Sequence, residues 1–407
     1  MSKKVGILTH YYHSNNYGGN LQAYALVHFI NSLNGVSAEQ ISYDFLSVAN
    51  NKKNIGIICF IKQLFKYPRS TIKAKIKPAV LHVKRFRARS FHMMLFQLLY
   101  FNRKFALRNK KIVDFNERIV PHSNKIYTIA DISESNLMYD VFITGSDQLW
   151  SSYDPVFSLD FVKPSKTIIS YAASVGRKEL PESDMQKFKN VLPRFDAISV
   201  RDRTDFEIVS KLTSKKVSIV LDPVFLLSSS EWNKIIPPKR KISGKYVFCY
   251  LLGDRKHSKE VAVNFAKKHN LQFVYIPHFK DNENAILDND LKISEKNIYD
   301  VSPADFVGLI KNADYVITDS FHAVVFSIIY HRQFFCFERV SKWGDMSSRL
   351  INLLKSIECL NRYCCGDDKE NLCYMNNIKS IDYNVVDALY LENLNYSKKF
   401  LKDFLEV

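Results

Sequence analysis

The sequence lacks long apolar runs, and it contains few of the residues that mark disordered or collagen-like chains. No window of 18 apolar residues is free of charge, so we expect no membrane-spanning helix. The start, MSKKVGILTHYY, has no extended apolar core, so we expect no secretory signal. Only 12 Gly and 12 Pro occur in 407 residues, of which 46% are hydrophobic. This composition indicates a globular chain, and its length exceeds one ordinary core, so two domains are expected.

Cysteine is also sparse, and its spacing excludes the common cysteine-based sites. The seven cysteines form no regular framework of the kind found in disulfide-rich secreted domains. Cys364 and Cys365 are adjacent, without a CxxC pair or partner histidines, so we expect no metal there. These absences favour a reducing cytoplasm.

Acidic residues are absent from one long segment. Between residues 45 and 113 there is no Asp or Glu, but there are 17 Lys or Arg. The rest of the chain carries equal numbers of acidic and basic residues, so the formal net charge of +17 arises within this segment. Charge confined to one segment indicates a local binding device rather than a general aid to solubility.

The basic segment also contains apolar stretches, such as IGIICFIKQLFK and SFHMMLFQLLYF. Basic amphipathic helices commonly bind anionic membrane surfaces, where each cation contributes up to about 1 kcal/mol. We therefore expect segment 45–113 to bind an anionic membrane surface, with plain packing against the protein as the alternative. Nucleic acid is not expected as a partner, because no helix-turn-helix, zinc-finger, RRM or KH pattern occurs.

Strand and helix patterns alternate along both halves of the chain. KVGILTHY, YDVFITG and AISVRD are typical of buried strands, as are KYVFCYLLGD, QFVYIPH and DYVITDS later on. This alternation predicts an α/β fold with two doubly wound, Rossmann-like domains. We expect a first domain over 1–228 with a basic helical insertion at about 50–125, and a second domain over 229–380. A C-terminal helix over 381–407 is expected to pack back on the first domain.

Ligands of paired α/β domains bind at the carboxyl ends of the strands, in the cleft between the domains. This rule selects polar residues that follow the predicted strands, with His278 as a weaker candidate. The candidates are Asn15, Asn16, Gly18, Gly19, Ser146, Asp147, Gln148, Arg201, Ser320 and His322.

Two of these motifs have a structural alternative. Gly18 and Gly19 precede a predicted helix, whose backbone N–H groups could hold an anion; alternatively, a tight turn could require a positive φ. TGSDQLWS could be a helix cap beside a buried Trp150. It carries more polar side chains than a cap requires, which favours contact with a ligand.

Arg201 and His322 suit an anionic ligand. The Arg201 guanidinium could form a surface ion pair with Asp202 or Asp205, or it could hold a carboxylate or phosphate with two hydrogen bonds. His322 stands at the start of a predicted helix, where a neutral imidazole is favoured and can exchange a proton with an anion. Asp319, three residues earlier, could orient His322 or cap the helix.

Five motifs follow one another in an order that is specific when taken together. They are NNYGGNLQAYAL (15–26), DVFITGSDQLWS (140–151), ISVRD (198–202), LDP (221–223) and SPADFVGLIKNADYVITDSFHAVVFSII (302–329). In this order they resemble the polysaccharide pyruvyl transferase family, over residues 4 to about 355 apart from the basic insertion.

The resemblance implies a two-domain fold similar to GT-B glycosyltransferases. It implies phosphoenolpyruvate as the donor substrate, no metal or organic cofactor, and a pyruvate ketal that bridges two hydroxyls of a sugar. The acceptor would belong to a surface polysaccharide or its lipid-linked precursor. Arg201 matches the family's strand-end arginine and His322 its motif histidine, and both are expected to contact the donor's anionic groups.

Ser320 departs from the family pattern, in which an arginine often stands two residues before the histidine. Another cation must then bind the donor, and Arg349, Lys342 and Arg203 are the candidates.

The chemistry requires cations for the donor's carboxylate and phosphate, an acid, and a base for the sugar hydroxyls. We expect His322 to contact phosphate and transfer the proton, and Asp147 to act as the hydroxyl base. The expected location is the cytoplasm, peripherally at the inner face of the plasma membrane, where a lipid-linked acceptor lies. A GT-B glycosyltransferase that uses a nucleotide sugar stays open as the alternative.

Overall fold

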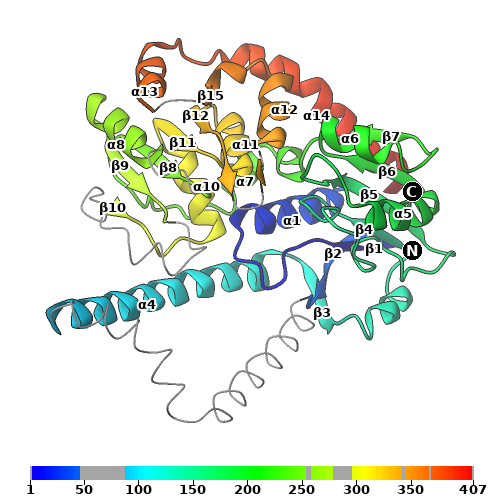
Figure 1. The fold of residues 1–407 in the computed structure, drawn as a ribbon. Coiled ribbons are helices and arrows are strands. Elements are labelled where there is room, and N and C mark those ends of the chain that lie inside the picture. The colour runs from blue at the N-terminus through cyan, green and yellow to red at the C-terminus, as the bar shows by residue number, and fades with distance from the viewer. Residues whose placement is uncertain are drawn as a thin grey trace, which may run out of the picture.

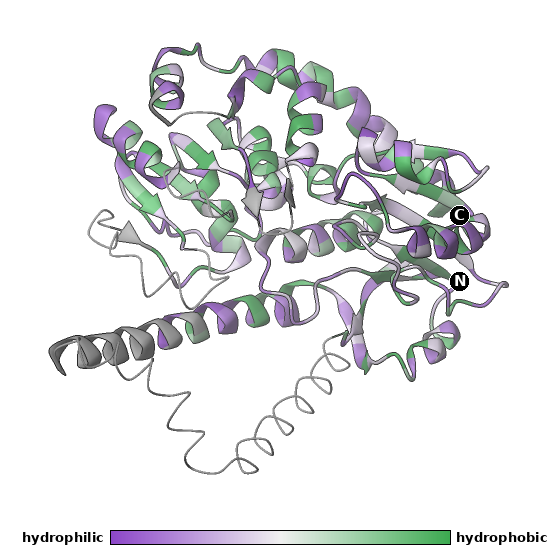
Figure 2. Ribbon diagram, viewed as in Figure 1, coloured by the Kyte–Doolittle hydropathy of each residue, from purple (hydrophilic) through white to green (hydrophobic). Residues whose placement is uncertain are grey.

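The computed structural model describes residues 2–45, 88–253, 258–277, 296–341, 344–345, 347–365 and 368–405. Within these ranges the chain forms two parallel β-sheets, each flanked by helices, that lie side by side (Figure 1). Hydrophobic residues gather in the strands and on the inward faces of the helices (Figure 2). The predicted α/β fold with two doubly wound domains is confirmed.

The first sheet has the strand order β3-β2-β1-β4-β5-β6-β7, and its neighbouring strands are parallel. The order extends outward on both sides of β1, so the winding reverses between β1 and β4 at a topological switch point. In β4 all four side chains are buried, as expected for a strand covered on both faces. The strands are β1 (Lys3–Leu8), β2 (Val36–Tyr43), β3 (His122–Tyr127), β4 (Val141–Thr144), β5 (Thr167–Ala173), β6 (Ala197–Val200) and β7 (Val217–Ile219).

The second sheet has the order β10-β9-β8-β11-β12-β15 and is likewise parallel. Its switch point lies between β8 and β11. A short antiparallel pair, β13 (Val340–Ser341) and β14 (Gly344–Asp345), follows β12. The strands are β8 (Tyr246–Tyr250), β9 (Gln272–Tyr275), β10 (Lys296–Asn297), β11 (Tyr315–Thr318), β12 (Gln333–Phe337) and β15 (Tyr363–Cys364).

Local sequence signals mark where some helices begin and where others end. Ser302 caps α10 (Pro303–Lys311) in a capping box with Asp305, as its Ser-Pro start predicts. Gly35, beyond α1 (Tyr17–Ile30), has a positive φ of 71°. The other helices are α5 (Glu182–Val191), α6 (Arg203–Val209), α7 (Ser229–Asn233), α8 (Ser258–Lys268), α11 (Phe321–Ile329), α12 (Ser348–Ser356) and α13 (Asp368–Asn377), with 3-10 helices η1 (Ile132–Leu137), η2 (Leu192–Arg194), η3 (Pro223–Leu226) and η5 (Leu360–Arg362).

The C-terminal helix α14 (Tyr383–Leu405) returns from the second domain to the first (Figure 1). The Oγ of Ser397 accepts a hydrogen bond from the Leu221 N–H at 2.8 Å. At its end, the Leu405 carbonyl oxygen accepts one from Lys3 Nζ at 3.1 Å. The helix therefore contacts both β1 and the segment after β7.

One long helix, α4 (Ala88–Ile119), forms the described part of the basic insertion, and residues 46–87 lie outside the described ranges. It runs along the lower side of the molecule in the view of Figure 1, and its 32 residues extend about 48 Å. Its C-terminal part packs on α1 and α10, that is, on both domains. Among the described residues, no helix is long and apolar enough to cross a membrane.

Candidate active site

Residues that follow strands of both sheets meet in one buried cluster between the domains. Those of the first domain come after β4, β6 and β7, and those of the second stand in the first turns of α11 and α12. Each is at most 9% exposed. The cluster consists of Ser146, Asp147, Arg201, Asp222, His322 and Arg349.

The Asp222 carboxylate is the centre of this cluster. Its Oδ2 accepts hydrogen bonds from Ser146 Oγ at 3.0 Å and from Arg201 Nη1 at 3.2 Å, and it lies 3.6 Å from His322 Nε2. Its Oδ1 accepts the Val224 N–H at 3.0 Å. Burial opposes ionisation, but His322 and Arg201 outweigh it and hold the pKa of Asp222 well below its ordinary value. Asp222 is therefore a buried carboxylate that faces the Arg201 guanidinium of its own domain and the His322 imidazole of the other.

Asp222 was not among the predicted site residues. The motif LDP carried part of the family resemblance, but the apolar run VSIVLDPVFLL concealed where the strand ends. Strand β7 ends at Ile219, so Asp222 also stands just beyond a strand end. The rule that selected Arg201 after β6 would have selected Asp222 if that boundary had been evident.

The Arg201 guanidinium is buried and only partly satisfied. Nη1 binds Asp222, and the group lies over the Phe321 ring, 4.8 Å from its centroid. Nε and Nη2 have no hydrogen-bond partner among the residues that the structure describes. The alternative of a surface ion pair is wrong, because the residue is only 6% exposed. Buried guanidinium donors without partners indicate a place for an anion.

A second guanidinium, that of Arg349, lies beside the first. Its Nη1 is 3.9 Å from Asp147 Oδ1. Burial, together with the like charge of Arg201, lowers the pKa of Arg349 to about 10. Asp147 resists protonation: burial raises its pKa, but Arg201, His322 and Arg349 outweigh burial, and the net pKa is lowered. Of the two proposed replacements for the family arginine that the structure describes, Arg349 lies in the cluster and Arg203 does not.

His322 reaches the first domain because Gly18 has no side chain. A Cβ placed on Gly18 would stand 2.0 Å from His322 Nδ1, which is far inside contact distance. A Cβ on Gly19 would meet the His10 carbonyl oxygen at 3.3 Å and Asp147 Oδ2 at 3.6 Å. The tight-turn alternative is wrong, since both glycines lie in the first turn of α1 without a positive φ. Gly18 instead allows the close approach of the second domain.

A model of the polysaccharide pyruvyl transferase family matches residues 16–340 of the chain. The chain belongs to the polysaccharide pyruvyl transferase family. The match includes Gly18, Asp147, Arg201, Asp222 and His322, while Arg349 lies just beyond it. No curated protein sequence matches the chain.

Solved structures are similar to this pyruvyl transferase family member over most of the chain, at low identity. The UDP-GlcNAc 2-epimerase of Methanocaldococcus jannaschii has a TM-score of 0.53 and 12% identity, covering 97% of this chain and 100% of that one. The S. aureus MnaA–UDP complex has a TM-score of 0.48 and 10% identity, and the match covers 98% of this chain and 91% of that one. Anabaena Alr3699/HepE with UDP and glucose has a TM-score of 0.47 and 8% identity, and the match covers 99% of each chain. The first of these likenesses supports the predicted GT-B-like fold.

Asp319 binds the backbone after β8 instead of His322 or the start of α11. Its two carboxylate oxygens accept the N–H groups of Leu252 and Gly253, each at 2.7 Å, and so join the ends of β11 and β8. It neither orients His322 nor caps α11, so that expectation is wrong. Ser320 is the N-cap residue of α11 but makes no side-chain cap bond; its N–H donates to Thr318 Oγ1 at 3.0 Å.

Three other candidates have partners within the chain. Asn16 Oδ1 accepts the Gly18 N–H at 3.0 Å, and Gln148 Nε2 donates to the Gly176 carbonyl oxygen at 3.1 Å. Ser146 is engaged with Asp222, as described above.

Of three further candidates, one lies away from the cluster and two are outside the described residues. Arg203 is not brought there, because its side chain is 66% exposed and pairs with Glu207 one turn later. Lys342 and His278 lie outside the described residues.

His10 is a second residue that sequence reasoning missed. It follows β1, and its ring lies 4.3 Å from the ring of Phe157 and 5.3 Å from that of Phe45, centroid to centroid. Burial lowers its pKa, although Asp147 and Asp154 act in the opposite direction. A neutral imidazole therefore stands near Asp147 on the first-domain side. The polar end of KVGILTHY was the available signal.

Proposed function

We propose that this family member transfers pyruvate from phosphoenolpyruvate onto two hydroxyls of a sugar, as a ketal. The observation that carries the proposal is the pair of buried guanidinium groups, Arg201 and Arg349, with two Arg201 nitrogens lacking partners among the described residues. Phosphoenolpyruvate offers a carboxylate and a phosphate, and guanidinium groups bind both bidentately.

In the proposed complex, Arg201 clamps one anionic group of the donor. Arg349 takes the role of the arginine that is absent at Ser320, since it approaches from the same domain as His322. The Asp222 carboxylate fixes Arg201 and faces His322, so both side chains are already oriented before the donor enters. A site oriented in advance stabilises charge without reorganisation during the reaction.

The proposed reaction moves three protons: one onto C3 and one from each attacking hydroxyl. One sugar hydroxyl attacks C2 while C3 gains a proton and becomes a methyl group. Phosphate then leaves with the C2–O bond electrons and takes up the proton of the second hydroxyl, which closes the ring. His322 is assigned to phosphate contact and proton delivery. Asp147, ionised at neutral pH because its pKa is lowered, is assigned to accept the hydroxyl hydrogen bond and proton.

The remaining predicted contacts receive supporting roles in this proposal. Gly18 and Gly19 let the second domain and Asp147 approach α1. Asn16, Ser146 and Gln148 position the loops of the site through their bonds within the chain.

The experiment is a direct assay for the product. Incubation with phosphoenolpyruvate and candidate lipid-linked sugars should release phosphate, and mass spectrometry should find the mass of one added ketal. Release of a nucleotide from sugar nucleotides, without phosphate from phosphoenolpyruvate, would instead establish the glycosyltransferase alternative.

We also propose that the acceptor is lipid-linked and that the protein binds peripherally to the inner face of the membrane. Segment 45–113, which has 17 Lys or Arg and no Asp or Glu, supports this proposal. Within α4, Arg103 and Lys110 are exposed, whereas Arg108 and Lys111 contact the second domain. Co-sedimentation with anionic vesicles should exceed that with neutral vesicles at low salt and decrease at high salt. Equal recovery with both vesicles would remove the electrostatic part of this proposal.

A further inference from the structure

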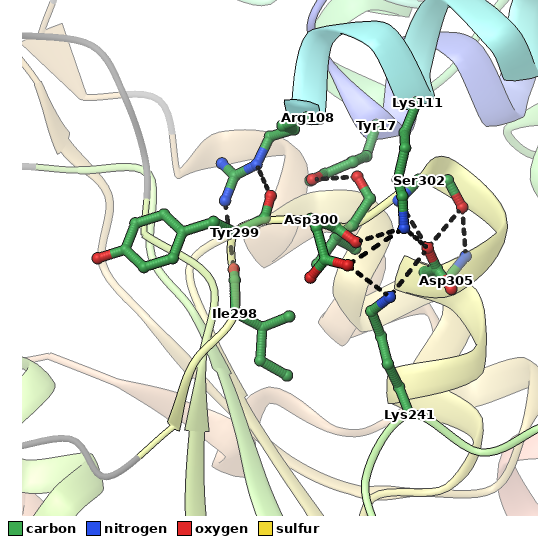
Figure 3. A network of polar contacts seen from close by, with 10 residues as sticks. Tyr17, Arg108, Lys111, Lys241, Ile298, Tyr299, Asp300, Ser302 and Asp305 are labelled. Carbon is green, nitrogen blue, oxygen red and sulfur yellow. Dashed lines mark hydrogen bonds and ion pairs between the residues drawn. The ribbon is translucent and has the colours of Figure 1, made fainter. Parts of the chain in front are cut away.

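Helix α4 belongs to the first domain in sequence, but it binds the second through Arg108 (Figure 3). The guanidinium donates from Nε to the Tyr299 carbonyl oxygen at 3.0 Å, from Nη1 to that of Pro277 at 2.8 Å and from Nη2 to that of Ile298 at 3.3 Å. Arg108 is only 5% exposed. These acceptors follow β9 and β10, so one side chain holds the carboxyl edge of the second sheet.

Lys111, one turn later, extends this contact. Its Nζ lies 2.9 Å from the Asp300 carbonyl oxygen and 3.7 Å from Asp305 Oδ2. Lys241 Nζ lies 3.5 Å from a carboxylate oxygen of each of the same two acids. Since Asp305 also completes the capping box of α10, α4 is joined to the start of that helix (Figure 3).

The turn that follows, on the same side of α4, binds the first domain. Ile112 and Phe115 are buried in its core, and Phe115 contacts the Tyr24 ring of α1. Asn116 Nδ2 donates to the Tyr11 carbonyl oxygen at 3.3 Å and to Asn20 Oδ1 at 3.2 Å. Within three turns, α4 is therefore anchored to both domains.

Tyr17 lies next to this anchor and next to the site. Its hydroxyl donates to the Val301 carbonyl oxygen at 2.9 Å, and its ring stacks on Phe306 with centroids 5.0 Å apart. The following residue, Gly18, is the one against which His322 packs. The contacts that position the second domain on α1 thus continue directly into the cluster.

We propose that α4 is a strap between the domains and that Arg108 is the positioning residue through which it acts. By holding the edge of the second sheet against the first domain, Arg108 keeps His322 opposite Asp222 without touching either. The effect of the strap on donor binding rests on the proposed function, because phosphoenolpyruvate is the donor only in that proposal. If the strap is loosened, a smaller fraction of molecules has the site assembled, and the apparent affinity for the donor falls by that fraction.

The test compares three variants of the full chain. Arg108→Met keeps a side chain of similar reach but removes its donors, and Arg108→Lys restores one charged donor. Arg118→Met, an exposed position in the last turn of the same helix, is the matched control. The measurements are the radius of gyration by small-angle X-ray scattering, KM and kcat with phosphoenolpyruvate, and the melting temperature.

We expect Arg108→Met to increase the radius of gyration and to raise KM for phosphoenolpyruvate about tenfold, with a smaller change in kcat because saturating donor selects the assembled state. Arg108→Lys should lie between Arg108→Met and the wild type, and Arg118→Met should match the wild type. A wild-type radius and KM for Arg108→Met would overturn the proposal. A lower melting temperature alone would also overturn it, because it would show a purely structural role.

A milder variant covers the case in which Arg108→Met does not fold. Lys111→Met removes only the contacts of α4 with Asp300 and Asp305, and it should change the radius and KM in the same direction. If it leaves both unchanged, the strap is refuted. Scattering does not depend on the reaction, so the two proposals can fail separately. A wild-type protein that releases no phosphate from phosphoenolpyruvate refutes the proposed function, while the radii still decide the strap.

Discussion

His322 Nε2 and Asp222 Oδ2 lie 3.6 Å apart, although the two residues belong to different domains and are 100 positions apart in sequence. The imidazole enters from the first turn of α11, and the carboxylate follows β7. Because the pair joins residues of two domains, the site is complete only when the two sheets are held together.

Replacing His322 should stop turnover without unfolding the protein. His322→Ala removes the proposed proton donor, and loss of a general acid lowers kcat by about 100-fold or more. Phosphate release and the melting temperature should be measured together. His331→Ala is the control, because this histidine is half exposed and pairs with Asp387 at the surface. A folded His322→Ala protein with the wild-type rate would disprove the assignment.

Changing Arg201 to lysine should weaken donor binding. A lysine keeps the charge but cannot present a planar pair of donors to a carboxylate or phosphate. We expect the Kd for phosphoenolpyruvate, measured by calorimetry, to rise at least about tenfold, the effect of one lost charge-assisted hydrogen bond. Arg203→Lys, two positions later and exposed, should bind as the wild type does. Equal affinities for the two variants would exclude Arg201 from the donor site.

Asp222 should make stability depend on pH. Its pKa is depressed in the folded protein, so its contribution is present above the ordinary aspartate pKa and is lost as pH falls through the folded value. Asp222→Asn should lower the free energy of unfolding by about 3 kcal/mol or more at pH 7, because it leaves Arg201 buried without its carboxylate. This difference should shrink below about pH 4. Urea titrations of both proteins from pH 7 to pH 3 measure it, and a constant difference would contradict the role of Asp222.

The two glycines of α1 should respond differently to alanine. At Gly18 the new methyl group would stand 2.0 Å from His322 Nδ1 and must displace the ring or separate the domains. At Gly19 the nearest atom would be 3.3 Å away, which a small shift accommodates. We expect Gly18→Ala to lose about 100-fold or more in kcat/KM, as misplaced catalytic groups do, and Gly19→Ala to keep most of the activity. Similar activities would show that His322 does not need this approach.

Local sequence signals were sufficient for the fold class and for part of the site. Alternating strand and helix patterns predicted the two parallel sheets, and the Ser302-Pro303 pair is typical of the N-cap and first position that it occupies in α10. These features depend on residues close together in sequence, where periodicity and caps act. The family pattern then identified Arg201 and His322, and its departure at Ser320 directed attention to Arg349.

Tertiary structure alone decided which groups meet. Asp222 is the centre of the cluster, where it faces His322. Gly18 leaves the space that His322 occupies. Arg108, one cation of the basic segment, forms a contact between the domains. Each of these facts pairs residues from different domains. The sequence determines which side chains exist and which local structure they prefer. Their partners follow from sheet order and from the burial of one domain against the other, which no local pattern records.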